Sequence, residues 1–205
     1  GGPLPTRLPD QAAHFDLAAG ADQAVVLEAG RLIWQALAVP GHDMEALAYY
    51  NPEQRILISG DALWENGFGV IFPELLGEAD GLASTRATLE MLSHLPIDVI
   101  IPGHGSPFAA VDAVFERAFR RVDSFSASID KLAWHAIKVI VSFAMMEKRQ
   151  LPAKDFPAFL RQLPFAVDVN QRYIGLPDDE LAARVLRELL LVNALRREDK
   201  ILFAG

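Results

Sequence analysis

Two histidines and one aspartate stand where apolar segments of the sequence end. His42 closes a Pro-Gly-His turn, Asp61 follows a glycine, and His104 lies in a Pro-Gly-His-Gly turn. Strand ends commonly carry functional side chains in α/β proteins, because the sheet fixes the backbone and the loop leaves the side chain accessible. Imidazole and carboxylate groups are suitable ligands for Zn²⁺ and related divalent ions. The sequence therefore predicts a metal site made of His42, Asp61 and His104. The alternative for each histidine alone is a simple turn with a polar tip.

The other histidines are weaker candidates for chemistry. His94 precedes Leu-Pro at the expected end of a helix, where a helix-end or surface role is predicted. His135 lies in a mostly apolar helical segment, which favours a packed core histidine over a ligand. His14 receives no role. Asp43 is interpreted as a solvated turn residue, with orientation of the His42 imidazole as the alternative.

The segment after Asp61 is rich in glycine and aromatic residues and has no clean period. Trp64, Asn66 and Phe68 lie in it, next to the predicted metal site. They are candidates for the wall of a substrate pocket. The alternative is that this segment serves only to pack the fold.

The elements that must position these residues follow from the apolar patterns and the turn signals. Two hairpins are predicted, with tight turns at Ala29-Gly30 and at Asn51–Gln54. The predicted strands are Gln23–Glu28, Arg31–Val39, Ala46–Tyr50, Arg55–Ser59 and Asp98–Ile101, with two more around Glu198-Asp199. The predicted helices are Gly77–Leu95, Ser106–Asp130, Lys131–Lys148, Phe156–Leu163 and Pro177–Asn193. In the second helix, Val111, Val114, Phe115, Ala118, Val122 and Phe125 share one apolar face.

This order of elements predicts an α/β protein of two domains. Residues 1–130 form an α/β unit, and residues 131–205 form a small helical unit with a terminal hairpin, in a winged-helix-like order. The net charge also differs between these two parts of the chain. Residues 1–130 hold 7 Lys+Arg and 18 Asp+Glu, for a net charge of −11. Residues 131–205 hold 12 Lys+Arg and 9 Asp+Glu, for a net charge of +3.

Composition narrows the possible functions. The 205 residues contain no cysteine, which rules out disulfides and thiolate metal ligands. The lack of cysteine also fits a reducing compartment, so a cytoplasmic location is predicted. No secretory signal is predicted at the N-terminus. The longest apolar-rich stretch, Leu132–Met146, is shorter than the roughly 20 residues of a spanning helix, so no membrane association is expected. The net charge of −8 makes a nucleic-acid partner unlikely on this basis.

The three candidate ligands carry a family resemblance. Pro40-Gly41-His42, Ile58–Asp61 and Ile101–Gly105 resemble, in order, the last three metal-binding motifs of the metallo-β-lactamase superfamily. The resemblance covers about residues 20–125. It implies an αββα sandwich with the site at its edge and zinc or another divalent metal, two ions in the complete site. His42 would then bind the first metal, Asp61 would bridge both, and His104 would bind the second.

The same resemblance implies a reaction. Members of this type are metal-dependent hydrolases, and an ester, thioester or lactone acyl bond in a small-molecule substrate is expected here. The tail is similar to the winged-helix extension of some glyoxalase II-like and lactamase-like hydrolases.

The sequence also departs from the family. The first ligands of such enzymes come from a His-x-His-x-Asp-His motif, and no His-x-His occurs in these 205 residues. The chain is thus expected to hold the C-terminal half of the domain, to bind metal weakly or not at all, and to be inactive by itself. Half a sandwich would expose apolar strand residues such as Val25, Leu27, Ile33 and Ile56, which favours a homo-oligomer or self-association.

The alternative hypothesis is a nucleic-acid-binding or regulatory module that uses the winged-helix-like tail. Its basic residues are Arg184, Arg187, Arg196, Arg197 and Lys200. The acidic run Asp178–Glu180 at the start of the last helix argues against it, because it would repel phosphate.

Overall fold

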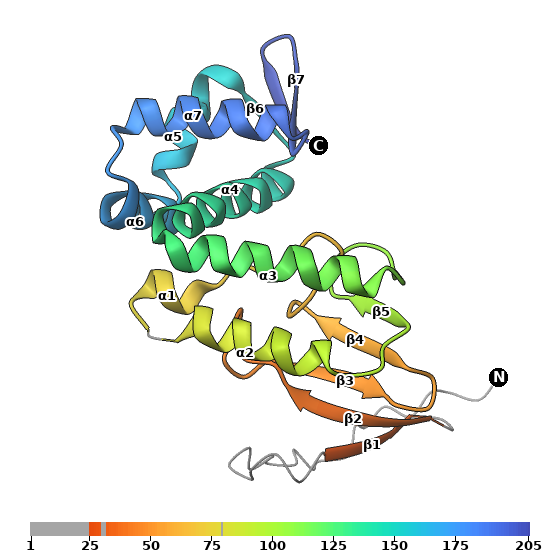
Figure 1. Ribbon diagram of the computed structural model, residues 1–205. Helices are drawn as coiled ribbons and strands as arrows, with labels where there is room; N and C mark the ends of the chain where they lie inside the picture. Colours follow the sequence, from red (N-terminus) through yellow and green to blue (C-terminus); the bar gives the residue numbers. More distant parts are fainter. Residues whose placement is uncertain (1–24, 30–31, 79) are drawn as a thin grey trace, which may run out of the picture.

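A five-stranded sheet forms the base of the molecule (Figure 1). The structure is a computed structural model that describes residues 25–29, 32–78 and 80–205. The strands lie side by side in sequence order, β1-β2-β3-β4-β5. Their bounds are β1 Val25–Ala29, β2 Leu32–Ala38, β3 Leu47–Asn51, β4 Ile56–Gly60 and β5 Val99–Pro102. Both predicted hairpins and the predicted strand before the second Pro-Gly-His turn are confirmed.

Strand direction decides where the candidate ligands lie. The pairs β1–β2, β2–β3 and β3–β4 are antiparallel, and β4–β5 is parallel. Strands β2, β4 and β5 therefore run in the same direction. Their carboxyl ends meet at one edge of the sheet, and these are the ends that precede His42, Asp61 and His104.

Two helices cover one face of the sheet (Figure 1). They are α2, Gly81–Ser93, which connects β4 to β5, and α3, Val111–Ala127. The buried core on this side includes Ala48, Tyr50, Leu57 and Ile100 from the strands and Leu89, Leu92, Val114 and Ala118 from the helices. The apolar face predicted for α3 is confirmed, because five of its six residues are buried and Val111 is partly buried.

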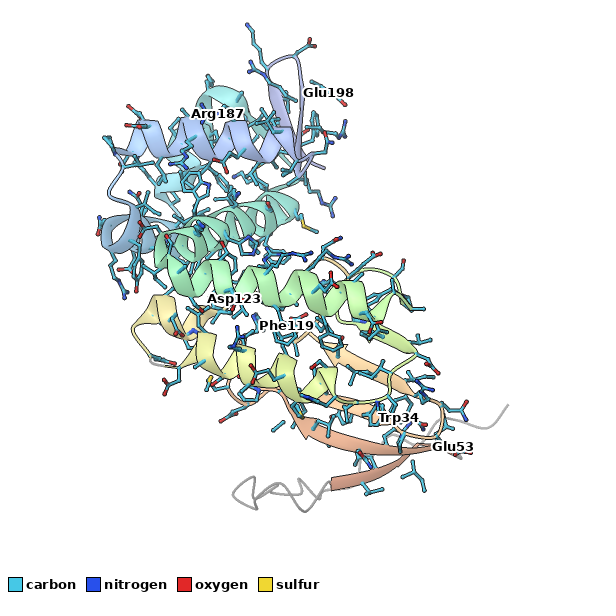
Figure 2. The ribbon with its side chains drawn as sticks, viewed as in Figure 1. Trp34, Glu53, Phe119, Asp123, Arg187 and Glu198 are labelled. Carbon is cyan, nitrogen blue, oxygen red and sulfur yellow. The ribbon has the colours of Figure 1, made fainter. Side chains whose placement is uncertain are left out.

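Side chains between the two helices hold them together. The Arg86 guanidinium of α2 pairs with Asp123 of α3 and lies 5.8 Å from the centre of the Phe119 ring. Figure 2 shows Phe119 and Asp123 on the side of α3 that faces α2. Helix α3 begins later than predicted. The reason is that Phe108 pairs with Ile100 of β5 and keeps the preceding residues extended.

The other face of the sheet is apolar and partly exposed. Leu27 lies opposite Trp34, Tyr49 lies opposite Ile58, and Ile58 is in register with Ile101, so these residues share a face. Figure 2 labels Trp34 on the sheet, far from the helical end of the molecule. Leu27 and Ile101 are each 36% exposed.

The predicted set of exposed strand residues needs one correction. Ile56 belongs to the open face, as does Leu27. Ile33 is exposed but pairs with Glu28, which places it on the opposite face. The side chain of Val25 lies outside the described part of the chain.

The rest of the chain is mostly helical (Figure 1). It comprises α4 Ile129–Lys148, α5 Phe156–Arg161, α6 Pro164–Val169 and α7 Asp178–Leu191, with a small sheet of β6 Gln150–Pro152, β7 Leu195–Glu198 and β8 Ile201–Ala204. The predicted helices and terminal hairpin are confirmed. Helix α6 and the π-helical turn Asn170–Ile174 were missed, because Pro164 was a plausible helix stop. The domain boundary and the likeness to a winged helix stay predictions.

A mixed α/β architecture is thus the observed fold, as predicted. A short helix, α1 Phe72–Leu76, precedes α2 and links the sheet to the tail. Arg172 and Tyr173 of the π-helical turn donate hydrogen bonds to the carbonyl of Leu75 in α1. One sheet layer carries helices on a single face, which agrees with half of an αββα sandwich.

We expect the chain to self-associate through the open sheet face, because contiguous exposed apolar surface favours association. Light scattering should give a mass above the 22.5 kDa of one chain. Ile101→Lys should shift the population towards the monomer. Met91→Lys is the matched control, because Met91 on α2 is also 36% exposed but lies on the helical side. A monodisperse monomer for the unmodified chain would contradict the prediction.

Candidate metal site

The three predicted ligands come together at the edge of the sheet. His42 Nε2 lies 3.6 Å from Asp61 Oδ2, and His104 Nε2 lies 3.7 Å from Asp61 Oδ1. Asp61 therefore stands between the two imidazoles and turns a different oxygen towards each. The side chains of His42, Asp61 and His104 are 27%, 34% and 58% exposed, so a solute can reach them.

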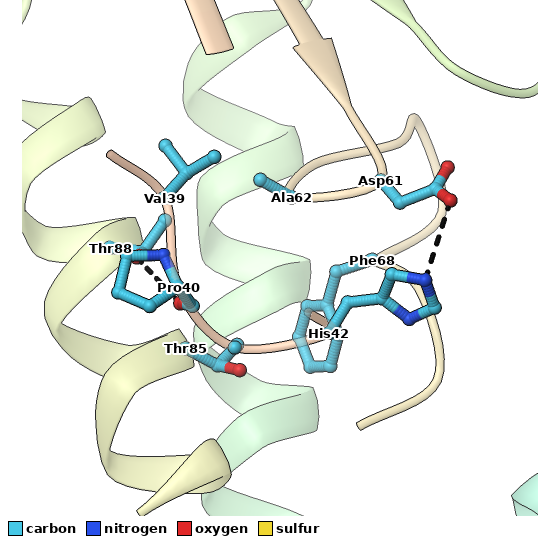
Figure 3. Close-up of a pocket in the computed structure, with 9 residues that line it drawn as sticks. Val39, Pro40, His42, Asp61, Ala62, Phe68, Thr85 and Thr88 are labelled. Atoms are coloured by element: carbon cyan, nitrogen blue, oxygen red, sulfur yellow. Dashed lines mark hydrogen bonds and ion pairs between the residues drawn. The ribbon is translucent and has the colours of Figure 1, made fainter. Parts of the chain in front are cut away.

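The turn that carries His42 is held against α2. Thr88 donates a hydrogen bond to the carbonyl of Pro40, at 2.8 Å (Figure 3). Gly41 has a φ of +152°, and a Cβ there would lie 2.3 Å from Thr85 Oγ1. A side chain at residue 41 would thus collide with the helix. Glycine at this position lets the turn approach α2 and point His42 towards Asp61.

The backbone also sets which nitrogen of His42 faces the site. Its Nδ1 lies 2.5 Å from the carbonyl oxygen of Val70. A carbonyl can only accept, so Nδ1 donates the hydrogen bond, and Nε2 is the nitrogen that faces Asp61. This is the usual arrangement behind a metal-binding imidazole. Phe72 packs on the other side of the ring, with centroids 5.5 Å apart.

Asp61 is surrounded by groups that fit closely. Trp64 Nε1 donates a hydrogen bond to Asp61 Oδ1 at 3.1 Å, and the Gly69 amide donates to the Asp61 carbonyl at 2.8 Å. A Cβ on Gly103 would lie 2.6 Å from Asp61 Oδ1. The glycine before His104 therefore makes room for the carboxylate of Asp61.

His104 is the most exposed of the three and is flanked by aromatic rings. The Trp64 ring meets it edge-on at 5.1 Å, and the Phe143 ring of α4 lies 6.4 Å away. Phe143 is 49% exposed. The tail thus contributes an apolar side chain to the border of the site.

The distances fit ligands of a metal better than direct hydrogen bonds. An N···O separation above 3.5 Å is too long for a hydrogen bond. Two ligand atoms at zinc-type bond lengths and a tetrahedral angle lie about 3.4 Å apart, close to the separations observed here. Within residues 25–29, 32–78 and 80–205, no group of three His, Cys, Asp or Glu side chains is arranged to hold one ion. The arrangement instead offers two positions, each with one imidazole and one carboxylate oxygen.

Part of the chain matches a known protein family. Residues 4–104 match the family described as the metallo-beta-lactamase superfamily. The match includes His42 and Asp61 and ends at His104.

Residues 4–104 of this chain belong to the metallo-beta-lactamase superfamily. Members of this superfamily are generally hydrolases and generally bind divalent metal ions.

Curated relatives of the chain include hydroxyacylglutathione hydrolases. That of Bartonella tribocorum is 37% identical over 59 residues, which cover 29% of this chain and 22% of the relative. That of Ectopseudomonas mendocina is 43% identical over 47 residues, which cover 23% of this chain and 18% of the relative. The matches thus span about a fifth of each relative's length.

Among solved structures, a beta-lactamase domain protein from Burkholderia ambifaria is similar to the chain. It is 23% identical, with a TM-score of 0.47 over 89% of this chain and 51% of that protein. A metallo-beta-lactamase family protein from Thermus thermophilus is 20% identical, with a TM-score of 0.44 over 89% of this chain and 52% of that protein.

In the described part of the chain, no helix is long and apolar enough to cross a membrane.

The three pocket candidates of this superfamily member differ in position. Phe68 is buried in the core at 2% exposure and lines a small cavity beside His42 and Asp61 (Figure 3). Trp64 is half-buried and contacts the ligands, as described above. Asn66 is exposed, and its carbonyl accepts a hydrogen bond from Arg121. A substrate-binding role for the three stays a prediction.

Sequence reasoning missed the arginines that hold this segment. Arg117 donates to the carbonyl of Glu65 through Nε and Nη2, at 3.1 and 2.8 Å, and Arg121 Nη1 donates to the carbonyl of Asn66 at 2.7 Å. Their spacing of four residues on α3 places both on one face of the helix and was the available signal. Burial lowers the pKa of Arg121.

A histidine supports Arg121 from α4. Arg121 Nη2 donates to His135 Nε2 at 3.0 Å, and the His135 ring stacks on Phe125 at 5.6 Å. Burial, together with the smaller effects of the charges on Arg121 and Lys138, lowers the pKa of His135 to about 3. The imidazole is therefore neutral and can accept a hydrogen bond from the guanidinium. Its packing agrees with the predicted core role.

The remaining candidates lie away from the site or outside the described residues. His94 is exposed at the end of α2, and its Nδ1 lies 2.6 Å from the Glu90 carbonyl, in agreement with the predicted helix-end role. Asp43 accepts a hydrogen bond from the Glu45 amide, as expected for a turn residue. His14 lies outside the described residues.

His135 should make stability depend on pH. Its pKa is lowered from 6.5 to about 3 in the folded state. Below pH 6.5 the unfolded chain therefore binds a proton that the folded chain excludes, so stability is complete above this pH and falls towards pH 3. We expect the His135 contribution to reduce the free energy of unfolding by at most about 3 kcal/mol between pH 7 and 4.

Urea unfolding at several pH values measures this effect. His135→Gln keeps an oxygen acceptor near the Nε2 position but does not titrate, so its stability should fall less steeply with acidification. His94→Gln is the control, because His94 is exposed at a helix end. Equal pH slopes for the unmodified chain and His135→Gln would contradict the prediction.

Proposed function

We propose that His42, Asp61 and His104 belong to the site of a metal-dependent hydrolase that cleaves an ester, thioester or lactone bond. The observation that carries the proposal is the position of Asp61, whose two oxygens face different imidazoles at 3.6 and 3.7 Å. One bridging carboxylate between two imidazoles suits a pair of divalent ions. Zinc or another divalent metal would be held there.

Each residue has a defined part in this proposal. When bound, the metal pair would supply an activated water at neutral pH and polarise the acyl carbonyl. His42 offers Nε2 because Val70 holds its other nitrogen. Asp61 supplies one oxygen to each position. His104, the most exposed, lies where a substrate would arrive.

A small-molecule substrate with an apolar or flexible part fits the surroundings best. Trp64 and the half-exposed Phe143 flank His104 and form an apolar border to the site. Asn66 and Phe68 would complete the wall on the side of Asp61. The names of the relatives favour a thioester such as a hydroxyacylglutathione as the first compound to test. A cytoplasmic location remains a prediction from the lack of cysteine.

No observation favours the nucleic-acid alternative. Arg184 pairs with Glu188 and lies 4.1 Å from the centre of the Trp134 ring. Arg196 pairs with Glu198, and Arg197 donates to the Asp199 carbonyl. These guanidinium groups thus interact within the tail. Figure 2 shows Arg187 and Glu198 at the end of the molecule that lies away from the five-stranded sheet.

This 205-residue chain should bind zinc only weakly, because each position has two protein ligands where a stable zinc site has three or four. Elemental analysis after dialysis should give less than one zinc per chain. His104→Asn should reduce zinc uptake in a titration further, whereas His94→Asn, at an exposed helix end, should not. One or more zinc ions per chain retained through dialysis would contradict this prediction.

The natural protein that contains these residues should hydrolyse an acyl bond in a metal-dependent way. We expect turnover of a hydroxyacylglutathione, a lactone or an aryl ester that is lost with a chelator and restored by zinc or another divalent ion. Asp61→Asn should lower kcat/KM by at least about 100-fold, because it removes a charged ligand. Asp43→Asn is the control, since Asp43 only caps a turn. Unchanged turnover in Asp61→Asn would refute the assignment.

A further inference from the structure

The Trp64 side chain contacts two of the three proposed ligands. Its Nε1–H donates to Asp61 Oδ1 at 3.1 Å, and its ring meets the His104 ring edge-on at 5.1 Å, with an interplanar angle of 81°. Asp61 Oδ1 is also the oxygen that faces His104 Nε2. Trp64 therefore lies at the half of the site that contains His104, the most exposed of the three side chains.

The hydrogen bond restricts the rotation of the Asp61 carboxylate. The terminal torsion of an aspartate is broad and has little preference of its own. A donor on Oδ1 fixes this torsion, so Oδ2 stays directed at His42 and Oδ1 at His104. Because the acceptor is charged, the bond is stronger than one between neutral groups.

The backbone around Trp64 is fixed at several points. Trp64 and Gly67 form a pair of backbone hydrogen bonds, at 2.6 and 3.2 Å, which closes a tight turn. The carbonyls of the two residues between them accept from Arg117 and Arg121 of α3. Gly67 has a φ of +134°, which favours glycine, and a Cβ there would lie 2.5 Å from Arg121 Nη1.

Arg121 is itself held from several sides. Its guanidinium lies 5.8 Å from the centre of the Phe68 ring and 5.6 Å from that of Phe125, and it donates to His135 of α4. A half-buried guanidinium with several partners supports the turn. The support therefore extends from α4 through α3 to the turn that carries Trp64.

We propose that Trp64 is a positioning residue that orients the Asp61 carboxylate between the two imidazoles, and that Arg121 holds the turn from which it does so. The role in metal binding rests on the proposed function, whereas the orientation of Asp61 does not. A tryptophan that served only for packing would require its ring but not its N–H. The two roles can be separated because phenylalanine keeps an aromatic ring and lacks the donor.

The first experiment is carried out without metal ions. Three indole N–H signals are expected in a ¹H–¹⁵N spectrum of the chain with a chelator present, one for each tryptophan. The signal missing from Trp64→Phe identifies Trp64. In Asp61→Ala this signal should move upfield and its proton should exchange faster with water. In Asp43→Ala it should not move. An indole signal that is the same in Asp61→Ala and the unmodified chain would overturn the proposal.

The second experiment measures zinc affinity of the natural protein by competition with a chromophoric chelator. Trp64→Phe should weaken binding roughly tenfold, as expected for the loss of a partner behind a metal ligand. The matched control is Trp134→Phe. It removes another indole bond to a carboxylate, the 2.7 Å bond to Glu188 in the tail, and should leave zinc affinity unchanged.

The two experiments separate the possible failures. If the natural protein binds neither zinc nor another divalent ion, the proposed function is wrong, and the indole signal alone decides whether Trp64 orients Asp61. If zinc binds and Trp64→Phe binds it as tightly as the unmodified protein, the positioning role is overturned. A loss in Trp64→Ala but not in Trp64→Phe would also overturn it, because the ring and not the N–H would then be responsible.

Discussion

The parallel pairing of β4 with β5 is the constraint on which the site depends. It sets Gly60 beside Pro102 at the ends of neighbouring strands, so Asp61 and His104 leave the sheet at the same edge. Strand β3 reverses the chain between β2 and β4, which brings the end of β2 and His42 to that edge as well. The register of this pair shifts by one residue between Ile58 and Gly60, directly before Asp61. The hydrogen bonds of the sheet therefore fix where the three candidate ligands leave their strands.

Close approach of the backbone at two glycines also positions the candidate ligands. A Cβ at Gly69 would lie 2.8 Å from the His42 ring, and one at Gly103 would lie 2.6 Å from Asp61 Oδ1. Neither glycine needs a positive φ, so space and not backbone conformation requires glycine there. The ligands are packed against bare backbone, which holds them near the orientation that two ions would need. Such orientation before binding reduces the entropy that metal binding would otherwise lose.

Sequence patterns predicted the sheet, most helices and the three convergent residues, because apolar alternation and turn signals are local. The Pro-Gly-His turns could be placed at strand ends without any knowledge of the tertiary fold. Long-range partners could not be predicted in this way. The Val70 carbonyl behind His42 and the Arg121–His135 pair depend on how α3 and α4 pack, and nothing near them in the sequence signals it. Ile33 was assigned to the wrong face, because the pairing register of β1 with β2 is not visible in β2 alone.

The tail is part of the architecture of the site. Phe165 of α6 packs edge-on against Phe72 at 5.5 Å, and Phe72 in turn contacts His42. Phe143 of α4 lies beside His104, and His135 of α4 holds the arginine that supports the turn next to Asp61. Each of the three candidate ligands is thus linked to a residue beyond Asp130 through at most a few contacts. A tail that acted as a separate binding module would need none of these links. Its packing instead places residues 131–205 against the same edge of the sheet, where they border and support the candidate ligands.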